Sequence, residues 1–382
     1  MHCFSRCLFW LAALYVSGWA CATEAPTAQP AVPQVEKPAP HIALLLPLKS
    51  AVFKRAAETV QQGFLAAAST QTKALPVRVY GSADEAKDIS ALYRQALASG
   101  ARAVIGPLTR SGVATLAAEP GITVPTLALN MFEGKSSDKL YFFGLSAEAE
   151  ARQAAQLALD ASLRGAIMIS TNAPLSKRLS LAFAEEWKLR GGYIEAELLY
   201  NDDPSIFADI VAEADSMVFL AADADTARLI RPYLNGALPV YATSQLFNGN
   251  ADTLGNYDLK DVRFADMPWL LQPDHPAVMI YPRANPPLEP DMERLYALGI
   301  DAFRLIQILL DNDTRSALPL DGVTGRIHLN RLRQFQREAV AVVFKQGRAL
   351  TPEQAAALAA EQAAALAARA ASAVAPAAAP AQ

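Results

Sequence analysis

The sequence predicts an α/β protein built from two doubly wound, parallel-sheet lobes that are joined by several hinge crossovers. Short continuous apolar runs, such as IALLLP from Ile42, alternate with helical patterns, which is typical of parallel strands buried on both faces. This alternation stops near Leu129 and starts again at Gly165. The stretch from Ile42 to Leu350 is also longer than one such sheet comfortably holds, so two lobes are expected.

The first 20 residues have the features of a secretory signal peptide. They contain one arginine, no acidic residue and an apolar run from Leu8 to Val16 that is too short to span a bilayer. Two processing sites remain open, namely ordinary cleavage after Ala22 and lipidation of Cys21 in the lipobox-like segment GWAC. All three cysteines lie within the first 21 residues. The exported body therefore has no free thiol, as suits an oxidising compartment.

Composition divides the rest of the chain into four regions. Residues 21–40 form a Pro- and Ala-rich tether, which favours an extended chain. Lobe 1 is predicted over 41–145 with a returning segment near 277–320, and lobe 2 over 146–276 with a returning segment near 321–350. Residues 351–382 are an Ala-rich, low-complexity tail that contains EQAAALAA twice. Thr351 as N-cap, Pro352 at the first helical position and Gln354 three residues after the cap predict a helix that ends near Ala375.

Several classes of function are disfavoured. The net charge is −4 and basic residues do not cluster, so neither nucleic acid nor an anionic membrane surface is an expected partner. No two of the four histidines have metal-ligand spacing, and no motif of a hydrolase, zinc protease, P-loop or dinucleotide site occurs. We therefore expect no catalytic residue, no metal and no cofactor.

A family likeness runs through the same body. The segments IALLLPL, VIGPLTRSGVATLA, VPTLALN, GLSAEAEARQAA, AFAEEWKLRGG, VYATSQ, RLYALGIDAFRL and DGVTGRIHLNRLRQFQREAVAVVFKQG follow one another between about residues 42 and 348. Their order resembles the penicillin-binding-protein activator (LpoA-like) family, whose fold is that of the type I periplasmic binding proteins, with two lobes that close like a Venus flytrap. The resemblance implies an outer-membrane lipoprotein, lipidated here at Cys21, that contacts a class A penicillin-binding protein. Longer members carry a helical-repeat domain where this chain has its tether.

Open parallel sheets bind small ligands beyond the carboxyl ends of their strands. The polar residues that could line such an interlobe cleft are Lys49, Ser50, Thr109, Ser111, Asn130, Ser146 and Ser244. Ser and Thr at these positions are also common helix caps, which is the preferred interpretation, and no acid-plus-aromatic pair suits a ligand amino group. A small-molecule ligand is therefore not expected.

The apolar segment MPWLLQPDHP has two interpretations. Trp269, Leu270 and Leu271 could contact a partner, since buried aromatic side chains often dominate binding energy. They could instead pack inside the second interlobe crossover, which is the interpretation we favour.

The sequence thus predicts a non-enzymatic, exported regulator that binds and activates a class A penicillin-binding protein from the periplasmic side, with the membrane reached only through a lipid anchor. The alternative is a periplasmic receptor for an amino-acid-like solute that serves an uptake system.

Overall fold

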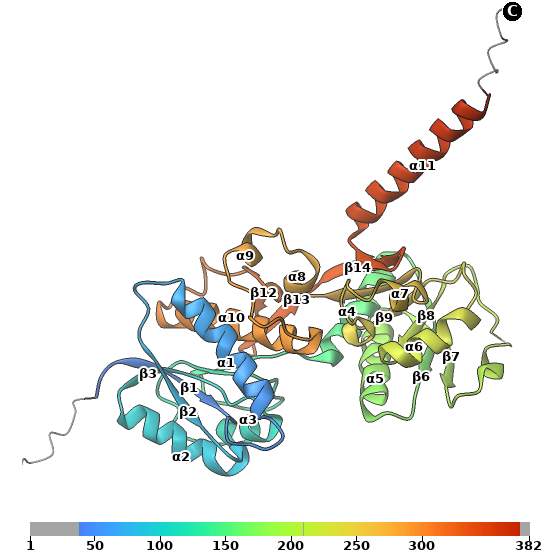
Figure 1. The fold of residues 1–382 in the computed structure, drawn as a ribbon. Helices are drawn as coiled ribbons and strands as arrows, with labels where there is room; N and C mark the ends of the chain where they lie inside the picture. The colour runs from blue at the N-terminus through green and yellow to red at the C-terminus, as the bar shows by residue number, and fades with distance from the viewer. Residues whose placement is uncertain (1–37, 209, 375–382) are drawn as a thin grey trace, which may run out of the picture. The chain divides into compact units, whose positions relative to one another are not determined.

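The computed structural model describes residues 38–208 and 210–374. The predicted signal peptide, Cys21 and most of the predicted tether lie outside the described residues. The described strands form two mixed, mainly parallel sheets (Figure 1). This arrangement confirms the predicted fold class.

The first sheet has the strand order β11-β12-β13-β5-β4-β3-β1-β2. Its strands from β2 to β13 are parallel, and the β11–β12 and β12–β13 pairs are antiparallel. Its strands are β1 (His41–Leu46), β2 (Val77–Gly81), β3 (Ala101–Ile105), β4 (Thr126–Ala128), β5 (Leu140–Phe143), β11 (Leu320–Gly322), β12 (Gly325–Leu329) and β13 (Gln334–Glu338).

The second sheet has the order β15-β14-β10-β9-β8-β6-β7. It is parallel from β7 to β10, and β14 and β15 extend it as antiparallel strands. Its strands are β6 (Gly165–Ser170), β7 (Tyr193–Leu199), β8 (Ser216–Ala221), β9 (Val240–Ala242), β10 (Val262–Asp266), β14 (Val340–Lys345) and β15 (Arg348–Leu350).

Helices cover both faces of each sheet, because successive side chains of a buried strand point to opposite faces. In β1, Ile42 and Leu44 join the core under helices α1 and α10, whereas Ala43 and Leu45 join the core under α2 and α3. In the second sheet, α4 and α5 cover one face and α6 the other. The longer helices of the lobes are α1 (Lys54–Ser69), α2 (Glu85–Ala98), α3 (Arg110–Ala117), α4 (Ala147–Asp160), α5 (Pro174–Leu189), α6 (Ala224–Ile230) and α10 (Pro290–Leu310).

The chain passes between the lobes at three places within the described residues. It leaves β5 for α4, returns from β10 through the short helices α8 (Pro268–Leu271) and α9 (Pro276–Met279) to α10, and crosses again from β13 to β14. The last crossing corrects a predicted boundary. The sequence placed residues from about 321 in the second lobe, but β11, β12 and β13 extend the first sheet, and only Ala339 separates β13 from β14.

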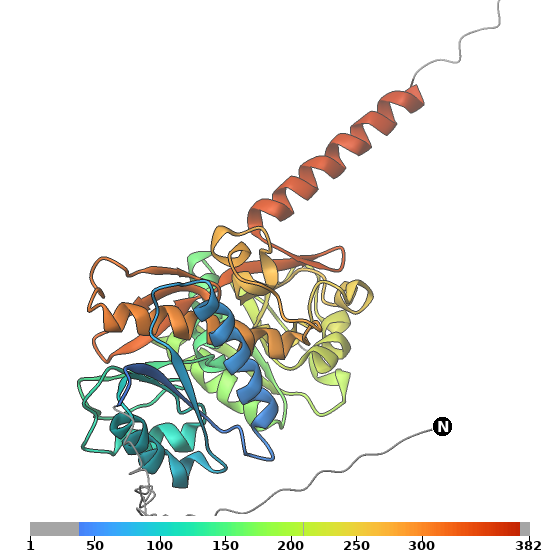
Figure 2. The same ribbon diagram turned by 60° about the vertical axis from the view of Figure 1, so that its left-hand side comes forward.

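The Ala-rich tail begins with the predicted cap. The Gln354 amide N–H donates to the Thr351 hydroxyl at 3.3 Å, and the Thr351 N–H donates to the Gln354 side chain at 3.0 Å. The helix that follows, α11 (Pro352–Val374), extends away from both sheets (Figures 1 and 2). Among the described helices, none is both long enough and apolar enough to cross a membrane.

Candidate functional site: the interlobe hinge

The predicted cleft residues of the first lobe follow the carboxyl ends of β1, β3 and β4. The Ser50 hydroxyl accepts from the Phe53 N–H at 3.3 Å, whereas the Lys49 side chain is exposed. Thr109 caps α3 by accepting from the Gly112 N–H at 3.1 Å, and its hydroxyl lies 3.3 Å from that of Ser111.

Asn130 links two of these strand ends. Its Nδ2 donates to the Leu108 carbonyl at 3.0 Å, and its Oδ1 accepts from the Met131 N–H at 3.0 Å. The structure thus brings Thr109, Ser111 and Asn130 to one edge of the first sheet. A ligand at this edge would have to compete with these internal hydrogen bonds, except at Lys49.

Ser146 and Ser244 lie in the second lobe and have different surroundings. Ser146 caps α4 by accepting from the Ala149 N–H at 3.1 Å. Ser244 is buried, and both its N–H and its hydroxyl donate to the Glu150 carboxylate, at 3.1 and 2.6 Å. Ser244 is therefore part of a hinge contact in this structure.

Trp269, Leu270 and Leu271 form the second crossover. The Trp269 side chain is fully buried, its Nε1 donates to Glu293 at 2.5 Å, and the Arg283 guanidinium lies 3.7 Å from its ring centroid. Leu271 packs in the core of the second lobe, and the half-buried Leu270 contacts the cores of both. A direct contact of Trp269 with a partner would require this side chain to leave the core.

A buried arginine joins α10 of the first lobe to loops of the second. Arg294 pairs with the fully buried Asp266 at 2.7 Å and donates to the carbonyls of Ser244 and Phe247, at 3.2 and 3.0 Å. Burial lowers the pKa of the Arg294 guanidinium, but the Asp266 carboxylate more than offsets this, so the pKa is raised. Arg294 therefore stays protonated.

A second buried ion pair joins the lobes beside the third crossover. Arg337 at the end of β13 donates to the Glu150 carboxylate in the first turn of α4 at 2.5 Å. The other Glu150 oxygen holds Ser244, whose carbonyl is bound by Arg294. Arg337, Glu150, Ser244, Arg294 and Asp266 thus form one continuous chain of contacts, which we call the hinge network.

Asp301 helps to position the Arg337 guanidinium through Thr324. Asp301 is fully buried in α10 and accepts from the Thr324 N–H and hydroxyl, both at 2.8 Å. The Thr324 carbonyl in turn accepts from Arg337 at 3.4 Å. Burial raises the pKa of the Asp301 carboxyl, and the Arg304 guanidinium opposes this shift.

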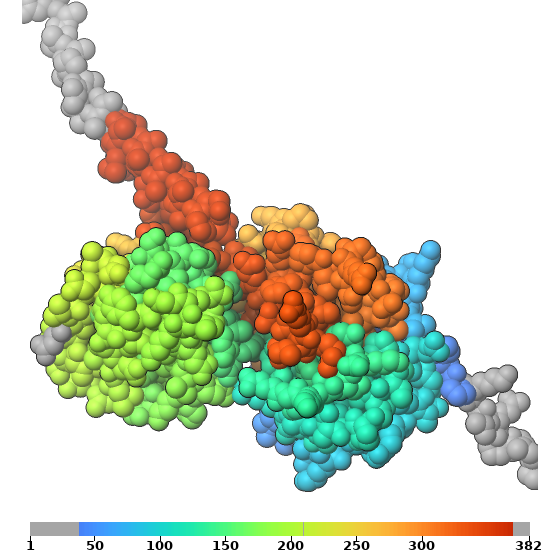
Figure 3. Space-filling model, turned by 180° about the vertical axis from the view of Figure 1, so that it is seen from behind, coloured from blue at the N-terminus to red at the C-terminus, as the bar shows by residue number. Residues whose placement is uncertain are grey.

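A more exposed bridge spans the lobes near the first crossover. Glu148 in α4 lies 3.0 Å from Arg110 of α3 and 3.0 Å from Arg178 of α5. Desolvation raises the Glu148 pKa, but hydrogen bonds from its own N–H, Arg110 and Ser146 outweigh it, so the pKa is lowered. Figure 3 shows the molecular surface hollowed between the green and yellow second lobe and the blue-to-teal first lobe.

The hinge network was not predicted from the sequence. One available signal was the pair Arg294 and Asp301, two charged residues seven positions apart with only the uncharged stretch LYALGI between them. That spacing is two helical turns, which puts both on one face, and buried charges require partners. Glu150 and Arg337 gave no comparable signal, because each lies in a locally polar segment.

The geometry is that of a bridge between two bodies. Each buried carboxylate of the hinge network is held by arginine or by hydroxyl and backbone N–H donors. In the part of the chain that the structure describes, no group of three or more His, Cys, Asp or Glu side chains could hold a metal ion.

Comparisons with known proteins agree with this architecture. The chain is 27% identical over 318 residues to a Glaesserella parasuis protein named penicillin-binding protein activator LpoA, covering 80% of this chain and 54% of the relative. A Haemophilus influenzae protein of the same name is 27% identical over 326 residues, which cover 82% of this chain and 55% of the relative. The chain spans about half the length of the curated relatives it matches. These matches confirm the resemblance to the LpoA-like family.

Solved structures confirm the predicted type I periplasmic binding protein fold. A Chromobacterium violaceum structure described as a "putative branched-chain amino acid ABC transporter" is 39% identical, with a TM-score of 0.70, and covers 80% of this chain and 99% of its own. Full-length LpoA from Haemophilus influenzae is 24% identical, with a TM-score of 0.69 and coverages of 81% and 58%. The family model described as "LppC putative lipoprotein" matches residues 18–213 and 211–347. The chain therefore belongs to the LppC family.

Proposed function

We propose that this protein is a non-enzymatic regulator that binds a class A penicillin-binding protein and activates its peptidoglycan synthesis. The observation that carries the proposal is the match to relatives named penicillin-binding protein activators over about four-fifths of this chain. The hinge is in keeping with it, because its buried charges pair with one another and join the two lobes.

The mechanism we propose is a shift in population. A regulator that binds the active conformation of the synthase more tightly than the inactive one increases the fraction of active enzyme, without taking part in the chemistry. The hinge network keeps the contact surfaces of both lobes in a fixed relation, which lowers the ordering cost of binding.

The proposed location is the periplasm, with attachment to the outer membrane through a lipid on Cys21. The description of the family as lipoproteins supports this proposal, and Cys21 itself lies outside the described residues. Metabolic labelling with a palmitate analogue tests it. Label should appear on the wild type and be lost in Cys21→Ser.

The test of activation is reconstitution of the mature chain with a purified class A synthase. Pull-down should recover the complex, and glycan polymerisation and peptide cross-linking should accelerate. A monofunctional transpeptidase is the matched control and should be neither captured nor stimulated. Equal rates with and without the regulator, or no recovered complex, would contradict the proposal.

A second candidate function is favoured by the structure from Chromobacterium violaceum, which is 39% identical and carries a transporter description. As a solute receptor, the protein would bind an amino-acid-like molecule between its lobes. Saturating branched-chain amino acids should then raise the melting temperature by several degrees, because a ligand that binds only the folded state stabilises it. An activator should show no such shift.

A further inference from the structure

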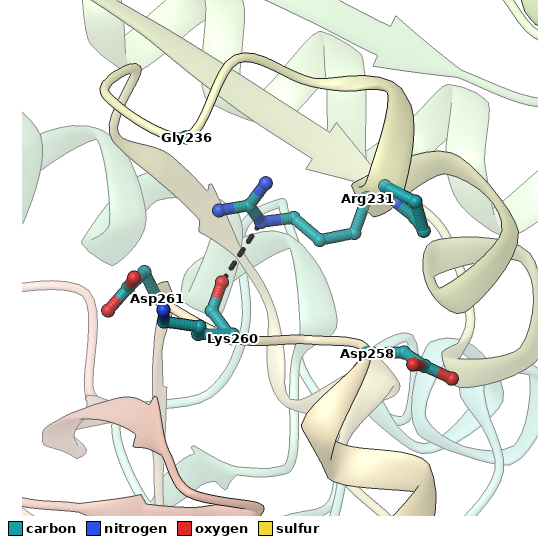
Figure 4. A pocket seen from close by; sticks show the side chains of 6 residues that line it. Arg231, Gly236, Asp258, Lys260 and Asp261 are labelled. Carbon is teal, nitrogen blue, oxygen red and sulfur yellow. Dashed lines mark hydrogen bonds between the residues drawn. The ribbon is translucent and has the colours of Figure 1, made fainter.

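A surface pocket lies on the second lobe, at the edge opposite the carboxyl strand ends. It has a volume of about 330 Å³ and is lined by Arg231, Pro232, Gly236, Asp258, Lys260 and Asp261 (Figure 4). These residues precede β9 and β10, so the pocket is at the amino ends of the parallel strands. It is distinct from both the hinge network and the predicted cleft residues.

Arg231 is the polar group on which the pocket is built. Arg231 is only 8% exposed, and two backbone carbonyls hold its guanidinium in place. Nε donates to the Lys260 carbonyl at 3.0 Å, and Nη1 donates to the Leu234 carbonyl at 3.3 Å. Within the described residues the third nitrogen, Nη2, has no hydrogen-bond partner. Nη2 is not fully buried, so its N–H groups reach solvent. The cavity that Arg231 lines is this pocket.

The charges around the pocket favour an anion. Asp261 forms an ion pair with Lys345, and its carboxylate also attracts the Arg231 guanidinium, whose pKa burial lowers and Asp261 raises. Arg231 and Lys260 have no ion-pair partner among the described residues. Of the two acids that line the pocket, Asp258 also has none within the described part of the chain. With Lys345 included, three cations therefore stand against the two carboxylates of Asp258 and Asp261. A guanidinium that is already immobilised loses little entropy on binding, and its N–H groups suit a carboxylate.

The geometry points to a binding site for a carboxylate group, held by Nη2 of Arg231 with Lys260 as the second cation. The carboxylate could belong to a free small acid or to an acidic side chain of a protein partner. The volume is near the lower end for small-molecule sites, so it suits one such group with a short apolar stem.

Gly236 offers a way to close the pocket without disturbing Arg231. A Cβ built on Gly236 meets no atom within 4 Å, and the backbone there does not require glycine. Gly236→Leu should therefore add a bulky side chain to the lining of the pocket while leaving both carbonyl contacts of Arg231 intact. Gly121→Leu is the matched control, because Gly121 also has no neighbour within 4 Å of its added Cβ and lies in the first lobe.

The experiment follows the backbone amides of Leu234 and Gly236 by NMR in the full mature chain. The probes are succinate, the neutral analogue succinamide, a blocked Gly-Glu-Gly peptide and its Gly-Gln-Gly counterpart. Saturable shifts are expected with a carboxylate probe and not with the neutral counterparts. Gly236→Leu should weaken binding at least about tenfold by steric exclusion, and Gly121→Leu should leave it unchanged.

The two sources of the carboxylate give different patterns. A response to succinate identifies a small-acid site, whereas a response to the glutamate peptide alone identifies a site for a partner's side chain. The absence of saturable shifts with both carboxylate probes overturns the inference. So does an affinity that Gly236→Leu leaves unchanged.

Discussion

Asp266 and Arg294 carry opposite charges where almost no solvent reaches them. Removing two such charges from water is costly, and the cost is offset only when geometry and further hydrogen bonds are good. Here Asp266 also accepts from the Met267 N–H at 2.8 Å, and Arg294 binds two carbonyls and Asp291. Losing one partner would leave the other charge buried and uncompensated.

Asp266→Asn should therefore lower the free energy of unfolding by about 3 kcal/mol, as expected for one broken buried pair. Urea denaturation measures this change. The control is Glu185→Gln, which removes the exposed pair with Arg152 and should cost less than about 1 kcal/mol. Equal effects of the two substitutions would show that burial does not strengthen the Arg294 pair.

Glu148 gives a prediction about pH. Its folded-state pKa lies below its usual value of 4.5, so its bridge to Arg110 contributes fully above that pH and is lost as pH falls through the folded pKa. The stability difference between wild type and Glu148→Gln should be constant from neutral pH down to the usual glutamate pKa and then shrink in more acidic solution. Stability curves of the two proteins that stay parallel below the usual glutamate pKa would contradict the assignment.

The candidate site was only partly predictable at this scale. Thr109 and Ser146 were recognised because a hydroxyl before a helical pattern has a local role as a cap. Glu150 and Arg337 were not, because their pairing joins residues 187 positions apart and leaves no local trace. The buried Arg231 is similar, since its ligands are carbonyls that any sequence supplies.

Among the described elements, α1 and α10 pack against each other most extensively, and glycine makes this close approach possible. A Cβ on Gly299 of α10 would lie 2.2 Å from the Val60 carbonyl oxygen of α1, and one on Gly63 would lie 1.9 Å from the Tyr296 carbonyl oxygen. Each contact is with backbone, so neither helix can relieve it by turning a side chain.

Gly299→Ala should therefore destabilise the protein by about 3 kcal/mol, although alanine normally favours a helix over glycine. Thermal unfolding measures the change. Gly121→Ala is the control, since its Cβ has free space and should leave the melting temperature almost unaltered. A melting temperature for Gly299→Ala equal to that of the wild type would mean that the two helices can separate without cost.

Elements with one strong sequence pattern were predictable. The point at which the chain passes from one sheet to the other was not. The apolar run of β1 and the capping box of α11 each specify their own structure. The run EAVAVVF, in contrast, reads as one strand, whereas the chain changes sheets at Ala339 between β13 and β14. The change depends on which partner strand is available, and this is a tertiary property.

At the scale of the whole molecule, three crossovers and one hinge network act on the same interface. A connection made only by flexible crossovers would let the lobes move and unfold separately. The buried pairs Arg337–Glu150 and Arg294–Asp266 add contacts between the lobes. Loss of these contacts would expose the charges to solvent or leave them buried without a partner. The free energies of unfolding of the two lobes are therefore coupled.

Coupling of this kind predicts a single calorimetric transition for the wild-type body. In the double variant Arg337→Met with Asp266→Asn both buried ion pairs between the lobes are broken, so the lobes should unfold in two resolved steps. Arg152→Met, on the exposed face of the same helix α4, should keep one transition, because the Arg152 pair with Glu185 lies within the second lobe. Two transitions in the wild type, or one in the double variant, would mean that the crossovers and not the buried charges determine whether the lobes unfold together.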